Sequence, residues 1–118
     1  MVSEEEISSK YEEFENLRQA YLLIENKRQK VLQDLAETEN ALKELSNLPN
    51  EKKVYFMIGN LLIEKDKKEL INKLNEDQEI LKVEAEKLKK QSDIYKEKLN
   101  SLTKELNDLL KRSDLQSK

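Results

Sequence analysis

The chain contains no cysteine, no histidine and no tryptophan, and it has one glycine and one proline in 118 residues. The missing cysteine and histidine exclude thiol nucleophiles, thiolate metal sites, imidazole bases and disulfides. The many carboxylates form no catalytic constellation, because pairs such as Glu84 with Lys87 have the spacing of ion pairs on solvent-facing helix positions. The sequence therefore predicts a protein that is not an enzyme and that binds no cofactor or metal.

Long apolar runs are also missing, since a membrane span needs about 18–20 consecutive apolar residues. The first ten residues are acidic and polar, unlike a secretory signal peptide. The formal net charge is −3, whereas phosphate binding requires a basic face. We therefore expect a cytoplasmic protein that binds neither a membrane nor nucleic acid.

What the sequence does contain is charge, 40% of residues, with apolar residues at regular heptad spacing. Ser3 and Glu6 form a capping box, which predicts the start of a helix. Pro49 predicts its end, because proline and the residue before it disfavour helix. The first helix is thus predicted over 3–48. Its two core positions are occupied by Ile7, Phe14, Tyr21, Leu35 and Leu42, and by Leu17, Ile24, Val31 and Leu45.

A second helix is predicted over 67–113, with Asp66 as its N-cap and Glu69 completing the capping box. The cap also accounts fully for Asp66, which could otherwise be taken for a metal ligand. We expect the residues from Ser113 onward to fray. Its core positions are occupied by Leu74, Leu81, Leu88, Tyr95, Leu102 and Leu109, and by Ile71, Ala85, Leu99 and Leu106.

A β-hairpin is predicted over 53–65, between the helices. Gly59 and Asn60 separate two apolar runs, and a two-residue hairpin loop needs the positive φ that glycine adopts. Both faces of this hairpin are apolar, and an uncovered apolar hairpin is prone to aggregation. We therefore expect other chains to cover it. The predicted assembly residues are Val54, Tyr55, Phe56, Met57, Ile58, Gly59, Asn60, Leu61, Leu62 and Ile63.

These elements predict an all-α dominated fold: a single domain, 1–118, in which an antiparallel two-helix coiled coil is joined by a central β-hairpin. The alternative is a long parallel dimer, which would leave the glycine–asparagine turn without a purpose. Arg28, Gln78 and Ser92 interrupt the apolar seams. Such polar residues fix the register of a coiled coil; the alternative is that they make the arms flexible.

Antiparallel pairing would bring the two ends of the chain together at the tip farthest from the hairpin, roughly 60–70 Å from the turn. Apolar residues gather at both ends, and no further heptad covers them there. They either seal the helix pair or form an apolar surface that binds a non-native protein. The predicted client-binding residues are Ile7, Tyr11, Phe14, Leu106, Leu109, Leu110 and Leu115.

The helix–hairpin–helix layout with VYFMIGNLLI at its centre resembles a β-type prefoldin subunit, in particular the archaeal form. The family signature is a valine–tyrosine pair, then a glycine usually followed by asparagine, then an aliphatic strand. Val54, Tyr55, Gly59 and Asn60 match it, and the stretch from Ala41 to Leu45 resembles the family's helix end. Two features depart from the family: Phe56 stands where a polar residue is common, and the chain starts with an acidic run rather than with glutamines.

The resemblance implies an ATP-independent chaperone. Two α-type and four β-type subunits would pair their hairpins into a β-barrel platform, from which the coiled-coil arms extend. The arm tips would hold unfolded client proteins and deliver them to a group II chaperonin. The alternative is a structural coiled-coil spacer or filament subunit without client binding. An RNA-binding arm is a third hypothesis, which the acidic charge disfavours.

Overall fold

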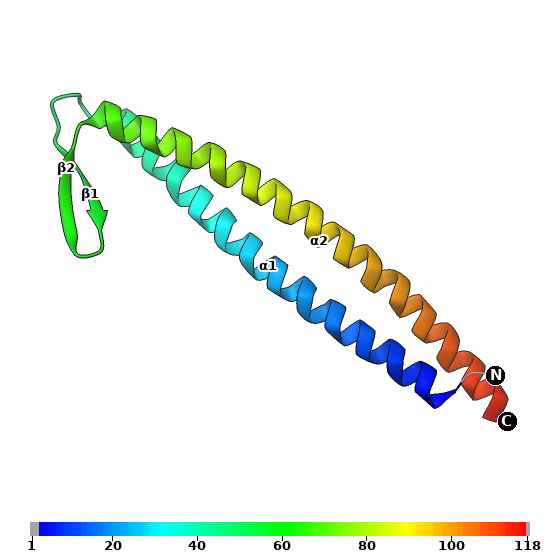
Figure 1. Ribbon diagram of the computed structural model, residues 1–118. Coiled ribbons are helices and arrows are strands. Elements are labelled where there is room, and N and C mark those ends of the chain that lie inside the picture. The colour runs from blue at the N-terminus through cyan, green and yellow to red at the C-terminus, as the bar shows by residue number, and fades with distance from the viewer. Residues whose placement is uncertain (1–2, 118) are drawn as a thin grey trace. The chain divides into compact units, whose positions relative to one another are not determined.

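The computed structural model describes residues 3–117, with side chains described for residues 3–113. It contains helix α1 (Glu4–Asn47), strands β1 (Val54–Ile58) and β2 (Leu61–Lys65), and helix α2 (Lys67–Ser117), in the predicted order (Figure 1). The element types and the start of each element agree with the prediction to within a residue. The expected fraying from Ser113 is not found, because α2 stays helical to Ser117.

The chain divides into two compact units, and each contains a segment of both helices. Unit 1 takes in the chain up to Arg28 and from Lys87 onward, and unit 2 is Gln29–Glu86. Inside each unit the segments of α1 and α2 lie side by side and run in opposite directions (Figure 1). This confirms the predicted antiparallel pairing within one chain. That the whole chain forms a single domain stays a prediction.

Side-chain and backbone caps fix the helix ends. The Ser3 hydroxyl accepts a hydrogen bond of 3.0 Å from the Glu6 N–H, which is the first half of the predicted capping box. At the start of α2 the Asp66 carbonyl accepts from the Leu70 N–H at 3.0 Å. The Lys67 ammonium donates to the Leu48 carbonyl, just beyond α1, and to the Asn50 side chain. Lys67 therefore ties the linker that follows α1 to the first turn of α2.

The apolar seams lie between the helices in both units. Every predicted heptad residue is buried or half-buried, and the deepest are Val31, Leu45, Leu88, Leu102, Leu106 and Leu109. Among the described side chains, however, none is less than 2% exposed. Two helices cannot enclose a core from all sides, so the apolar area removed from water is small for a chain of this length.

The hairpin has the predicted two-residue loop. Ile58 pairs with Leu61, and the ladder continues to Val54 opposite Lys65. Gly59 has φ of 56°, and Asn60 has a negative φ, which is the pattern of a type II′ turn. A side chain at Gly59 would meet no atom within 4 Å. The requirement for glycine therefore lies in the backbone conformation and not in space for a Cβ.

A small apolar core holds the base of the hairpin to the helices of unit 2. It joins Leu45 at the end of α1, Val54 at the start of β1 and Leu70 in the first turn of α2. Phe56, Ile71 and Leu74 pack against this cluster. Because Val54 and Phe56 point to the same face of β1, that face of the strand is the one attached to the helices.

Candidate functional site

Most of the hairpin is left uncovered by its own chain. Met57, Leu61 and Leu62 are 67%, 66% and 63% exposed, values typical of charged surface residues and not of large apolar ones. We use "hairpin surface" for the exposed apolar side chains of the two strands, which are Tyr55, Met57, Ile58, Leu61, Leu62 and Ile63. It lies in unit 2, with Tyr55, Met57 and Leu62 on one face of the hairpin and Ile58, Leu61 and Ile63 on the other. Exposed apolar side chains gathered on one element in this way mark a protein interface.

The predicted assembly residues thus divide into two groups. Val54 and Phe56 are occupied by the core of their own unit, and the Lys73 ammonium lies 4.9 Å from the centre of the Phe56 ring, in a cation–π contact. Phe56 therefore packs within its own chain and not on the outer surface of the hairpin. The remaining strand residues are free to meet another chain.

The strand edges are free as well. Within residues 3–117 the sheet has two strands, so β1 and β2 each keep one edge that no other strand of this range pairs with. Such edges accept a further strand readily. Beside β1, a mainly apolar hollow is lined by Tyr55 and Phe56 together with Leu45, Leu48 and Leu74. The hairpin surface therefore offers both apolar contact and strand pairing.

The predicted client-binding residues lie in unit 1, but they differ in accessibility. Tyr11 and Leu110 are 49% and 37% exposed. Ile7 and Phe14 are half-buried. Leu106 and Leu109 are 5% and 4% exposed, because they pack in the seam between α1 and α2. The side chain of Leu115 lies outside the described part of the chain.

Burial of Leu106 and Leu109 has a physical reason. The seam continues as far as Leu109, so the heptad leucines there are still covered by the facing helix. Tyr11 and Leu110 lie outside the positions that the seam covers. We use "tip surface" for these two side chains, which the seam leaves partly accessible near the ends of the chain.

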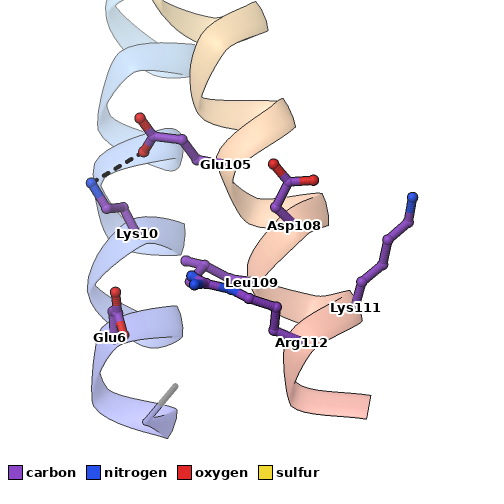
Figure 2. Close-up of a pocket in the computed structure, with 7 residues that line it drawn as sticks. All are labelled: Glu6, Lys10, Glu105, Asp108, Leu109, Lys111 and Arg112. Carbon is purple, nitrogen blue, oxygen red and sulfur yellow. Dashed lines mark ion pairs between the residues drawn. The ribbon is translucent and has the colours of Figure 1, made fainter. Parts of the chain in front are cut away.

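A groove between the helices lies at the same end of unit 1. Figure 2 shows Leu109 and Arg112 directed from α2 toward α1, whereas Lys111 points away from it. The other residues that line the groove are Glu6, Lys10, Glu105 and Asp108. Acidic and basic side chains stand together here, so the groove does not favour a ligand of one charge.

An ion pair connects the helices across this groove. The Lys10 ammonium lies 3.2 Å from a Glu105 carboxylate oxygen and 3.7 Å from Glu13 (Figure 2 shows the first of these). The hydrogen bond to Glu105, and after it the Glu105 charge, raises the pKa of Lys10 above its usual value. The raised pKa means that pairing of the helices favours the charged ammonium. The ion pair therefore contributes to the stability of the paired helices at neutral pH, and this contribution is lost only as the pH rises through the raised pKa. Its size is small because both groups are exposed.

A partly buried polar cluster lies further along the seam of unit 1. The Ser92 hydroxyl is buried and donates a hydrogen bond to the Glu25 carboxylate of the other helix. Arg28 donates to the same carboxylate at 3.4 Å. Sequence reasoning found Arg28 and Ser92 as polar interruptions of the seams but missed Glu25. Glu25 occupies the position flanking the seam. It lies three residues before Arg28, and this spacing, which is that of an ion pair within a helix, could have indicated it.

Ser92→Ala is expected to lower the free energy of unfolding by about 1–2 kcal/mol, because it removes a buried hydrogen bond to a charged group. Thermal and urea unfolding followed by circular dichroism measure the change. Ser101→Ala is the matched control, since Ser101 is an exposed serine of the same helix and gains the same helix propensity. Equal stability of the two variants would show that the cluster does not stabilise the pairing.

No helix between Glu4 and Ser117 has a stretch that is both long and apolar enough to cross a membrane. Across the same part of the chain, aspartate and glutamate side chains form no group of three placed to hold a metal ion.

Comparison with known families matches the chain to the family model described as "Prefoldin subunit", over residues 8–113. The chain belongs to the prefoldin family. The match includes the hairpin and nearly all of both helices, so the hairpin surface and the tip surface lie within it. Family membership supports a chaperone-type function in general terms.

Individual prefoldin relatives agree with the family match. The chain is 31% identical over 99 residues to a prefoldin subunit beta of Pyrococcus abyssi, with 84% of this chain and 85% of the relative covered. It is 36% identical over 77 residues to a prefoldin subunit beta of Sulfurisphaera tokodaii, with 65% of this chain and 62% of the relative covered. These relatives confirm the resemblance to β-type prefoldin subunits.

The fold of a solved prefoldin subunit agrees too. The crystal structure of the prefoldin beta subunit from Thermococcus strain KS-1 superposes with a TM-score of 0.80 at 28% identity, covering 92% of this chain and 94% of that one. The beta2 subunit of the same strain superposes with a TM-score of 0.69, covering 75% of this chain and 95% of that one. The two-helix coiled coil with a central antiparallel hairpin is therefore a prefoldin β-type fold.

Proposed function

We propose that this chain is a β-type subunit of an ATP-independent holdase chaperone, and that it assembles with α-type prefoldin subunits through its hairpin. The observation that carries the proposal is the hairpin surface. A two-stranded sheet with free edges and large exposed apolar side chains is unstable on its own in water. Pairing with the hairpins of other subunits would cover the side chains and satisfy the edges together.

The stoichiometry follows the prediction from the family resemblance: two α-type and four β-type subunits whose hairpins close into a β-barrel. A closed barrel removes every free strand edge, which an open stack of hairpins does not. The group of Val54 and Phe56 attached to the helices would hold each hairpin at a fixed angle to the arm's base within unit 2.

Client binding is assigned to the tip surface. Tyr11 and Leu110 are apolar side chains left partly accessible among charged residues, which suits weak and reversible contact with exposed apolar segments of an unfolded protein. Several arms on one platform bind the same client together, so each contact can stay weak. Release then needs no nucleotide, and a group II chaperonin in the cytoplasm would receive the client.

A structural spacer or filament subunit is the second candidate, and one observation favours it. Leu106 and Leu109, which sequence reasoning placed among the client-binding residues, are sealed in the seam. A spacer would need the hairpin for assembly but no apolar tip. The two candidates differ in whether the assembled protein keeps a denatured client in solution.

The proposal is tested by mixing the chain with an α-type prefoldin subunit. We expect a defined complex by sedimentation velocity and native mass spectrometry. The complex should also suppress aggregation of guanidinium-denatured citrate synthase, without added nucleotide. A complex that forms but gives no protection would support the spacer. A chain that stays monomeric at micromolar concentration, alone and in the mixture, would contradict the assembly proposal.

A further inference from the structure

The hollow beside β1 is a feature of unit 2 that the chain itself does not fill. It has a volume of about 480 Å³ and a mainly apolar lining. Leu45 and Leu70 form its buried floor. Its walls stay accessible, because Leu48 is 37% exposed and Phe56 and Leu74 are half-buried. The hollow can therefore take up an apolar side chain from another molecule.

The hollow adjoins the open edge of β1, which no other strand within residues 3–117 pairs with. Residues 53–56 line it, and none of its lining residues belongs to β2. It therefore lies on the side of β1 that faces away from β2. A strand added to this edge would run along the hollow, and every second side chain of that strand would share the face of Val54 and Phe56 and point into the hollow.

The β2 strand of another copy has suitable side chains on that face. In the chain's own hairpin, Ile63 lies opposite Phe56 and Lys65 lies opposite Val54. Ile63 and Lys65 therefore lie on the face of the sheet that is attached to the helices. A second β2 added to the open edge of β1 in the same antiparallel register would place its Ile63 beside Phe56, over the hollow.

We propose that the hollow beside β1 is a socket for Ile63 of a second copy of this chain, whose β2 pairs antiparallel with the open edge of β1. The inference rests on the proposed function, since it starts from assembly through the hairpin. It adds which edge, which strand and which side chain form the contact between two β-type copies. This contact covers Leu48 and the accessible part of Phe56.

Charged residues at the rim favour the antiparallel direction. Glu44 and Lys53 line the hollow, and β2 ends in Glu64 and Lys65. Among the described side chains, none of these four takes part in an ion pair within the chain. Antiparallel pairing brings Lys65 of the second copy to the base of the hairpin, near Glu44. Its Glu64 then lies on the outer face, near Lys53. Parallel pairing would instead carry both charges to the apolar Ile58 beside the turn.

The first test links two copies through engineered cysteines, which the natural chain lacks. One copy carries Tyr55→Cys, and a second copy with a different tag carries Glu64→Cys. The two positions lie opposite each other in the proposed register, as they do in the single hairpin. Their Cβ atoms should be about 4.5–5.5 Å apart, close enough for a disulfide after a small shift. We expect oxidation of the complex with the α-type subunit to link the two copies.

Met57→Cys with Glu64→Cys is the matched control pair. Met57 points to the same face of β1 as Tyr55, and both are exposed. A second β2 that ran parallel to β1, with its Ile63 again beside Phe56, would place its Glu64 opposite Met57 and not opposite Tyr55. We therefore expect little linkage of this pair.

The second test fills the hollow without changing the strand edge. Ala41→Trp places a large ring at a half-buried position that lines the hollow, where it would take the room of the incoming Ile63. The dissociation constant of the assembly should rise about tenfold, as measured by sedimentation velocity. Ala36→Trp is the control, because Ala36 is an exposed alanine of the same helix in unit 2 and does not line the hollow. It should leave the dissociation constant unchanged.

Linkage of Tyr55→Cys with Glu64→Cys, together with weaker assembly of Ala41→Trp, would support the socket. A complex of normal mass without this linkage would overturn it and leave the edge to a strand of the α-type subunit or of a client, while the proposed function would stand. Linkage through Met57→Cys instead would overturn it as well, and so would linkage without an effect of Ala41→Trp. If the unmodified chain forms no complex with the α-type subunit, the proposed function itself is wrong.

Discussion

Leu62→Asp is expected to prevent assembly while leaving the helices formed. Leu62 pairs with Met57 on the face of the hairpin opposite to Val54 and Phe56, and 63% of it is exposed in the chain alone. If subunits pair their hairpins, the new carboxylate is placed in a dry interface without a partner. This costs about 3 kcal/mol or more at each contact, which weakens each dissociation constant about a hundredfold.

Sedimentation velocity at micromolar concentration measures the assembly, and far-ultraviolet circular dichroism measures the helices. Val83→Asp is the control, because Val83 is an equally exposed apolar residue of α2 that lies outside the hairpin. Ile58→Asp repeats the test beside the turn, since Ile58 is exposed and pairs with Leu61. Unchanged oligomer mass in both hairpin variants would show that another surface drives assembly.

The success of the sequence-based fold prediction has a physical origin in local rules. A single glycine followed by asparagine between two apolar runs leaves the chain few conformations other than a tight hairpin, and Gly59 does adopt a positive φ. Heptad spacing defines which side of a helix is apolar whatever that side meets. The element order therefore follows from the pattern, and a tight hairpin between two helices of similar length favours their antiparallel pairing.

Features that depend on distant residues could not be predicted in the same way. Ser92 and Glu25 are separated by 67 positions, and their hydrogen bond exists only in one register of the two helices. Whether Phe56 meets its own helices or another subunit depends on the angle at which the hairpin leaves α2. The burial of Leu106 and Leu109 depends on how far the seam continues, and a heptad pattern does not state where pairing ends.

Because Leu106 and Leu109 are buried, a test of client binding has to change exposed residues only. Deleting about ten residues at each end would remove Leu109 and Lys10, the ion-pair partner of Glu105, along with Leu110, so it could not separate client contact from pairing of the helices. Substitutions at the exposed residues can separate them. The double variant Tyr11→Asp with Leu110→Asp changes the tip surface and leaves the seam intact.

This double variant is expected to assemble normally and to lose most of its ability to protect a client. Each arm loses two apolar contacts and gains two charges that repel apolar segments. Each arm is expected to lose about 1 kcal/mol of binding free energy. Because several arms hold one client together, these losses add up over the arms of the platform. The concentration needed for half-suppression of citrate synthase aggregation should rise about tenfold or more.

The matched control is Leu23→Asp with Val83→Asp, which replaces two exposed apolar residues away from the tip surface. Native mass spectrometry of both complexes checks that assembly is unchanged. Full protection of the client by the variant Tyr11→Asp with Leu110→Asp would mean that clients do not bind at these two residues. The dependence of client binding on salt concentration then shows whether Leu106 and Leu109 bind the client instead. Screening weakens the exposed ion pair of Lys10 with Glu105, so stronger client binding at high salt would indicate that the tip opens and presents Leu106 and Leu109. No change with salt would place client binding elsewhere on the arms, because a complex that protects a client is not a spacer.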